Sequence, residues 1–130
     1  MTCFWNGLIS GINKYHNKIK INNNPIEFVK FLKNNNKKTK SVIWNNKMLT
    51  SKQLIENYDS IIEYDISCIN QGYLCSSFDP FIFLVAELFK ININHNIMNK
   101  TSEQAIIKYT YKNAKNIIFV RSNTEHFSIK

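Results

Sequence analysis

The chain has 130 residues, 44% of them hydrophobic, and a formal net charge of +8. This length suits one domain, and this hydrophobic content is enough for a packed core, which excludes a disordered chain. The charge suggests nucleic acid as a partner, but sixteen of the seventeen basic residues are lysines and only Arg121 is an arginine. Because phosphate recognition favours arginine, we attribute the charge to the codon usage of an AT-rich viral or parasite genome, and nucleic-acid binding stays the less favoured alternative.

The three cysteines are Cys3, Cys68 and Cys75. Their odd number and spacing fit neither a disulfide framework nor a zinc site, so we expect no metal and no other cofactor. Residues 1–7 lack the basic and apolar regions of a signal peptide, and the longest apolar run, residues 80–89, is too short to cross a bilayer. The expectation is a single-domain, monomeric protein (residues 1–130) in a reducing intracellular compartment (host cytoplasm or virion), with no membrane partner.

Two helices are expected in the first third of the chain. Apolar residues at helical spacing predict a helix over residues 3–16, with Thr2 as its cap and Cys3 in its first turn. Pro25 favours the start of a second helix that ends near residue 33. The polar, basic stretch 34–40 is typical of a surface loop. Residues 41–44 then predict a short strand, followed by a tight turn at Asn45-Asn46.

A third helix is predicted from Thr50 or Ser51, because Thr50 and Gln53 have the spacing of a capping box. Its expected apolar stripe consists of Leu54, Ile55, Tyr58, Ile61 and Ile62. Residues 65–78 are expected to form a loop around Gly72. The pair Asp79-Pro80, an N-cap acid followed by proline, predicts the start of a buried helix that ends at residue 90.

Strand-like runs follow at residues 91–97, 105–111, 116–122 and 125–129. Helices early and strands late predict an α+β, or mixed α/β, fold. His95 alternates with asparagines in the first of these runs, so we expect it at the surface. His16 ends the first helix, where a cation suits the helix dipole, and we expect a structural role for it.

Cys3 and His126 carry the chemistry that the sequence suggests. A helix N-terminus lowers the pKa of a thiol and offers backbone N–H groups that can hold an oxyanion. His126 follows a polar turn and opens a strand, a suitable place for a general base. Taken separately, each also has an ordinary interpretation, as a small buried cysteine and as an exposed loop histidine.

Three segments together resemble the ovarian-tumour (OTU) family of deubiquitinases. Residues 3–8, CFWNGL, are similar to its nucleophile motif, a cysteine followed by two bulky apolar residues at the start of the first helix. Gly72-Tyr73 with residues 79–93 resembles its second landmark, an acid-capped buried helix that runs into a core strand. Residues 117–127 resemble the third, a strand, a turn and a histidine followed by an aromatic residue. The resemblance implies an OTU-like, papain-like fold with a small central sheet packed between helices.

The resemblance also implies a thiol protease that cleaves the isopeptide bonds of ubiquitin or a ubiquitin-like protein. Cys3 would attack the carbonyl carbon, and His126 would take the thiol proton and later give it to the leaving lysine amine. The substrate tail would lie extended in a groove, often as an added strand. Its arginines would suit an acidic cluster on the third helix, for which a solvated helix face is the alternative. The cluster comprises Glu56, Asp59, Glu63 and Asp65.

The chain departs from the family pattern at two places. The family has an acidic residue and a glycine before the cysteine, where this chain has Met1 and Thr2. The family also has asparagine or aspartate two residues after the histidine, where this chain has Ser128, whose hydroxyl can accept from a ring N–H. The third catalytic residue is therefore Ser128, Asn123, Glu125 or none. The alternative function is that of a weak or inactive OTU-like fold that acts as a basic nucleic-acid- or protein-binding module. Trp5, beside the nucleophile, is expected in the core rather than in a groove wall.

Overall fold

The computed structural model describes residues 3–16, 18–69, 75–98, 104–123 and 126–129, without the side chains of residues 75–78. Its helices are Cys3–Tyr15 (α1), Pro25–Asn34 (α2), Ser51–Glu63 (α3) and Cys75–Phe89 (α4), with a short 3-10 turn at Ile66–Cys68. Its strands are Val42–Trp44 (β1), Lys47–Met48 (β2), Asn92–Met98 (β3), Gln104–Tyr111 (β4), Ile117–Ser122 (β5) and Phe127–Ile129 (β6).

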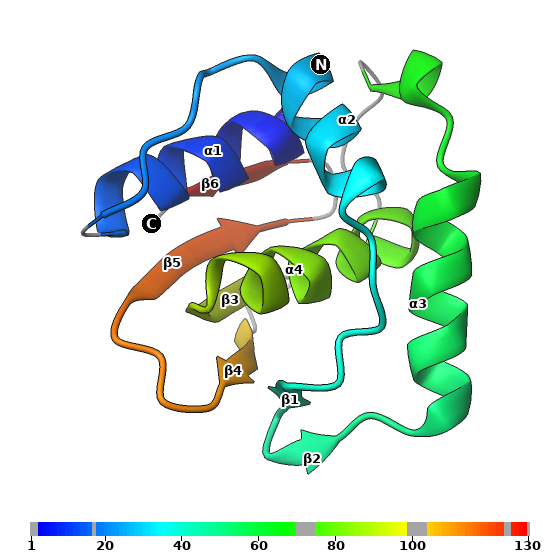
Figure 1. The fold of residues 1–130 in the computed structure, drawn as a ribbon. Helices are drawn as coiled ribbons and strands as arrows, with labels where there is room; N and C mark the ends of the chain where they lie inside the picture. The colour runs from blue at the N-terminus through cyan, green and yellow to red at the C-terminus, as the bar shows by residue number, and fades with distance from the viewer. Residues whose placement is uncertain (1–2, 17, 70–74, 99–103, 124–125, 130) are drawn as a thin grey trace.

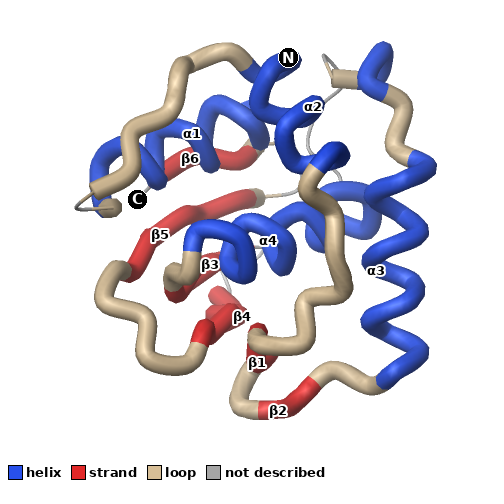
Figure 2. The backbone as a smooth tube through the Cα atoms, in the orientation of Figure 1, coloured by secondary structure: helices blue, strands red, loops and turns tan. Residues whose placement is uncertain are grey.

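The strands form one mixed sheet in the order β2-β1-β4-β3-β5-β6. The β3 and β5 strands pair in parallel, and every other neighbouring pair is antiparallel. Figure 2 marks the strands and helices, and the residue-number colours of Figure 1 show that the sheet comes mostly from the second half of the chain and the helices mostly from the first. The α+β class predicted from the sequence is confirmed.

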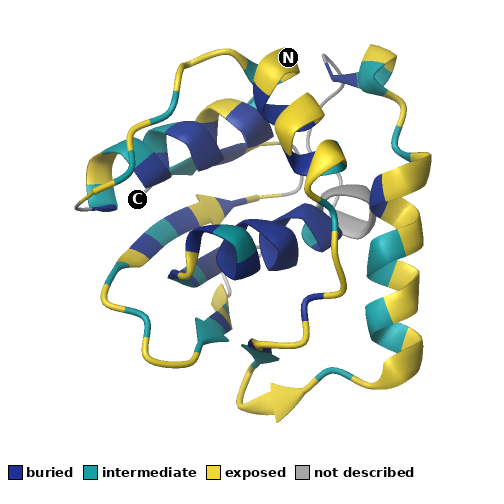
Figure 3. Cartoon of the chain, in the orientation of Figure 1, coloured by how far each residue is buried: buried dark blue, intermediate teal, exposed yellow. Residues whose placement is uncertain are grey.

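The α1 and α4 helices pack against the same face of this sheet. Ile93, Tyr109 and Ile118 lie side by side on neighbouring strands, so their side chains share that face. Gly11 of α1 lies against Ile118, and Phe83 of α4 meets the ring of Tyr109 edge-on at 4.8 Å. The α2 helix then packs on α1 and α4, and α3 packs on α4. The core therefore lies between the sheet on one side and the α1 and α4 helices on the other, and Figure 3 colours many residues of these two helices as buried.

Local signals in the sequence explain where several elements begin. The side chain of Asn24 accepts a hydrogen bond from the Glu27 amide, and Pro25 opens α2. Both bonds of the predicted capping box are present, between Thr50 and Gln53. Asn45 and Asn46 have φ angles of 48° and 67°, which is the left-handed backbone of the predicted tight turn between β1 and β2.

The predicted start of the fourth helix was wrong. The α4 helix begins at Cys75, one turn before the expected cap Asp79, and Pro80 lies inside it. Pro80 has no N–H to donate to the carbonyl four residues earlier, but it is buried, as are the five residues that follow it. Burial of this face therefore favours a helix that continues through Pro80 over one that starts there. The second OTU landmark therefore lacks its acid cap, and Gly72-Tyr73 lies outside the described residues.

The predicted apolar stripe of α3 is only partly buried. Ile61 is buried, but Ile55 and Ile62 are 46% and 53% exposed. The α3 helix packs on α4, and Figure 3 colours most of its residues as intermediate or exposed. Helical spacing thus identified the helix correctly and overstated the width of its buried face.

The close contact between α1 and β6 depends on Gly7. A Cβ atom at Gly7 would lie 2.6 Å from Cδ1 and 2.9 Å from Cε1 of Phe127. Phe127 is buried and meets the rings of Phe4 and His95, so it has little room to move. A glycine is therefore required for the helix to approach the strand this closely.

We expect Gly7→Ala to destabilise the fold by about 1–2 kcal/mol. Alanine favours a helix by about 1 kcal/mol over glycine, but overpacking a core costs about 1–3 kcal/mol. Urea denaturation measures the difference, with Lys14→Ala on the exposed side of α1 as the control. A Gly7→Ala protein more stable than the parent would contradict the close contact.

Candidate active site

The α1 helix and the β6 strand bring Cys3 and His126 to one cavity. We call this cavity of about 520 Å³ the cysteine pocket. It is lined by Cys3, Asn6, Gly7, Ser10, His126, Phe127, Ser128 and Ile129. Gly7 lies against Phe127, and Gly11 lies against Ile129, so the two elements run in the same direction. Cys3, one turn before Gly7, is therefore at the end of β6 where His126 stands.

Cys3 is the first residue of α1 and is half-buried, with a free thiol. Backbone N–H groups in the first turn of a helix have no partner within that helix, and the helix dipole favours negative charge there. The position can therefore offer backbone donors to an oxyanion. Cys68 is also free and half-buried. Cys75 begins α4, so the loop expected over residues 65–78 was wrong at its end, and Cys75 also stands at a helix N-terminus.

The backbone at His126 is fixed although its side chain is exposed. Its N–H donates to Oδ1 of Asn123 at 2.8 Å, and its carbonyl accepts from the Asn123 N–H at 2.9 Å. The next residue, Phe127, is buried and meets the Phe4 ring edge-on at 4.8 Å. These contacts fix the chain at His126, which lines the cysteine pocket.

The three candidates for the third catalytic residue differ in their surroundings. Ser128 lines the cysteine pocket, lies on the same side of β6 as His126, and its Oγ accepts from Nε of Arg121 at 3.4 Å. Asn123 uses its side-chain oxygen on the His126 backbone, which makes it a positioning residue. Glu125 lies outside the described residues.

His95 is buried, which overturns the expected surface position. It is 0% exposed, and its Nε2 lies 2.7 Å from Oγ of Ser122. The β3 strand is flanked by β4 and β5, and alternation places His95 with Ile93 on the helix-covered face, away from the asparagines. The alternation of Ile93, His95 and Ile97 with asparagines was the signal for this burial. Burial lowers the pKa of His95 from 6.5 to about 4.

This pKa predicts a loss of stability in acid. Above pH 6.5 His95 is neutral in both states. Between pH 6.5 and 4 the unfolded chain binds a proton that the folded chain does not. The free energy of unfolding should therefore fall by about 3 kcal/mol from pH 6.5 to pH 4 on account of His95. Urea denaturation across this range should show a flatter pH dependence for His95→Gln. Equal slopes for the two proteins would exclude His95 as the cause.

His16 has the structural role expected of it, through a different contact. It is 7% exposed, and its Nδ1 accepts from the backbone N–H groups of Lys18 and Ile19 at 3.1 and 3.0 Å. The ring closes the end of α1 as a hydrogen-bond acceptor, whereas the sequence suggested a cation.

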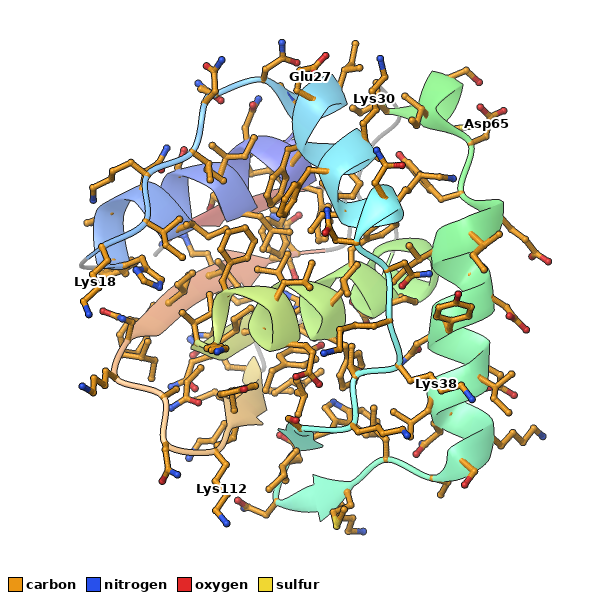
Figure 4. The ribbon with its side chains drawn as sticks, in the orientation of Figure 1. Lys18, Glu27, Lys30, Lys38, Asp65 and Lys112 are labelled. Atoms are coloured by element: carbon orange, nitrogen blue, oxygen red, sulfur yellow. The ribbon has the colours of Figure 1, made fainter. Side chains whose placement is uncertain are left out.

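The acidic cluster lies away from the cysteine pocket. All four of its carboxylates are exposed on or just after α3, and Asp65 is at a corner of the molecule in Figure 4. Glu56 lines a separate cavity of about 320 Å³ with Asp79 and Trp44. Among the described lining residues of the cysteine pocket there is no carboxylate, so the structure brings together Cys3, His126 and Ser128 but not these acids.

Within the described ranges, no three histidine, cysteine or acidic side chains gather as metal ligands would. The described helices include none with the length and apolar content that a bilayer requires. Comparisons with protein-family models, curated proteins and solved structures gave no match to this chain.

Proposed function

We propose that the protein is an OTU-like cysteine hydrolase that cleaves an isopeptide bond after the extended tail of ubiquitin or a ubiquitin-like protein. One observation carries the proposal. Cys3 and His126 stand at opposite ends of the sequence, yet both line the cysteine pocket at the N-terminus of α1. A thiol, an imidazole and the N-terminus of a helix around one cavity are the parts that acyl transfer needs.

The proposed reaction has two steps. His126 takes the thiol proton, Cys3 Sγ attacks the carbonyl carbon, and N–H groups of the first turn of α1 hold the oxyanion. The carbon–nitrogen bond breaks as His126 returns the proton to the leaving amine, which leaves a thioester on Cys3. His126 then removes a proton from water, the hydroxide attacks the thioester, and the carboxylic acid leaves as Cys3 recovers its proton.

The position of β6 supports an extended substrate. This strand is the last in the sheet order, and among the described residues it pairs only with β5, along one side. The cysteine pocket follows His126 and β6 on one side and about two turns of α1, from Cys3 to Ser10, on the other. A peptide lying there can pair with the free side of β6 as an added strand, which provides main-chain hydrogen bonds without sequence demands.

The proposal is tested with ubiquitin that carries a thiol-reactive group at its C-terminus. The full chain and the Cys68→Ser variant should each gain one ubiquitin, attached at Cys3, whereas Cys3→Ser should gain none. Peptide mapping by mass spectrometry locates the adduct. Labelling at Cys75 would contradict the assignment. No labelling, together with salt-sensitive RNA binding, would favour the binding module instead.

The contribution of the third residue is expected to be small. If Ser128 orients the imidazole, Ser128→Ala should lower turnover about fivefold, since a neutral hydrogen bond contributes about 1 kcal/mol. Ser128→Asp should raise turnover and the histidine pKa seen in the pH profile. Asn123→Ala and Glu125→Ala complete the comparison on one substrate. A loss of about tenfold in either one, with Ser128→Ala silent, would assign the role to that residue. If all three are silent, the site is a Cys-His dyad.

A further inference from the structure

A second cavity adjoins the cysteine pocket. This cavity of about 430 Å³, here called the arginine pocket, is lined by Met98, Arg121, Ser122, Asn123, His126 and Ser128. It shares His126 and Ser128 with the cysteine pocket, so the two cavities flank the same short segment of chain. A substrate positioned at Cys3 has the arginine pocket within reach of its neighbouring groups.

Arg121 supplies the charge of this cavity. It is the only arginine of the chain and lies opposite Ser128 on the paired strands β5 and β6. Its side chain is on the face of the sheet opposite to that covered by α1 and α4, because it alternates with the buried residues Val120 and Ser122. It is exposed there.

A hydrogen bond to Ser128 orients the guanidinium of Arg121, and its other N–H groups can donate to a ligand. Its Nε donates to Oγ of Ser128 at 3.4 Å, which leaves the four N–H groups of its two terminal nitrogens. Within the described part of the chain, the ion pair recorded is between Lys52 and Glu56, and no described carboxylate pairs with Arg121. Two parallel terminal N–H groups match the two oxygens of a carboxylate.

We infer that the arginine pocket is an anion subsite that binds a carboxylate carried by the substrate; its link to a substrate rests on the proposed function. Ser128 acts there as the residue that positions the guanidinium. A carboxylate fits better than a phosphate dianion, because Arg121 is the one permanent cation among the described residues that line this pocket. The net charge of +8 adds a long-range attraction for an acidic substrate.

The test is a binding titration of the full chain. The backbone amide NMR signals of Met98, Arg121 and Ser128 report the binding. The probes are two peptides that differ in one group, acetyl-Gly-Asp-Gly-amide and acetyl-Gly-Asn-Gly-amide. Only the aspartate peptide should shift these signals to saturation. Its affinity should fall at least tenfold in Arg121→Gln and less in Arg121→Lys, which keeps the charge without the planar fork. The matched control is Lys112→Gln, an exposed lysine in the turn after β4 (Figure 4), which should bind as the parent does.

Several outcomes would overturn the inference. Equal binding of the two peptides, or an equal loss in Arg121→Gln and Lys112→Gln, would reduce the effect to net charge. Tighter Arg121-dependent binding of inorganic phosphate than of the aspartate peptide would contradict the choice of a carboxylate.

The anion subsite and the catalytic proposal fail separately. Cys3→Ala should bind the aspartate peptide as the parent does, so the titration reports on the subsite without catalysis. Labelling of the parent by the ubiquitin probe reports on Cys3 without the subsite. Peptide binding without labelling would support the subsite and refute the hydrolase. Labelling without selective peptide binding would support the hydrolase and refute the subsite.

Discussion

Replacement of Cys3 by alanine is expected to abolish turnover of an isopeptide-linked ubiquitin substrate, and His126→Ala is expected to lower kcat by about a thousandfold or more. Cys3→Ala removes the only atom that can form the thioester in the cysteine pocket. In the proposed mechanism His126→Ala removes the group that takes the thiol proton, and members of a catalytic pair act as a unit. The double variant should therefore be no slower than Cys3→Ala alone.

Neither change is expected to unfold the protein. Cys3 is half-buried at the start of α1, and the side chain of His126 is exposed, so few core contacts are lost. Circular dichroism should match that of the parent. Cys68→Ala is the control, since it alters another half-buried free thiol outside the cysteine pocket and should keep full turnover. Activity that survives in Cys3→Ala, or disappears in Cys68→Ala, would refute the assignment of the nucleophile.

Trp5→Ala is expected to lower the free energy of unfolding by about 3–5 kcal/mol, the usual cost of removing a large buried aromatic side chain. Trp5 is 0% exposed, which confirms the core position predicted for it. Its ring meets those of Phe4 and Phe81 edge-on, each at 4.8 Å, and that of Tyr64 at 5.8 Å. The indole therefore joins α1 to α4 and to the segment after α3, and its loss leaves a cavity at their junction.

Urea denaturation of the parent and the variant measures this effect. The matched control is Phe31→Ala on α2, because that aromatic ring is 46% exposed and its loss leaves a smaller cavity. We expect Phe31→Ala to cost less than half as much as Trp5→Ala, and Trp5→Phe to cost less than Trp5→Ala because it retains part of the ring contacts. Equal losses for Trp5→Ala and Phe31→Ala would show that Trp5 is not central to the core.

Whether a given side chain is buried depended on which strands and helices pack around it, and short sequence patterns do not determine that arrangement. His95 became a core residue because β3 lies between β4 and β5, and its face is the one that α1 and α4 cover. Conversely, Ile55 and Ile62 stay exposed because the packing of α3 on α4 leaves them uncovered. In both cases the burial of the side chain depended less on its own polarity than on which elements pack against it.

The sequence by itself determined the elements whose signals act over about four residues. The Thr50–Gln53 capping box, Pro25 and the Asn45-Asn46 turn each satisfy or restrict backbone groups within one turn of the chain, so the same bonds form wherever the fold places them. The α+β class followed from the order of these elements.

Only the tertiary structure decided which distant groups meet. Cys3 and His126 share a cavity because Gly7 lets α1 lie against Phe127, a contact between the two ends of the chain. The packing of α4 in the core likewise overrode the start signal at Asp79-Pro80, because a buried helical face outweighs one missing hydrogen bond. Arg121 and Ser128 likewise became partners through the pairing of β5 with β6. Such contacts depend on close packing between segments far apart in sequence, and local residue patterns do not encode that packing.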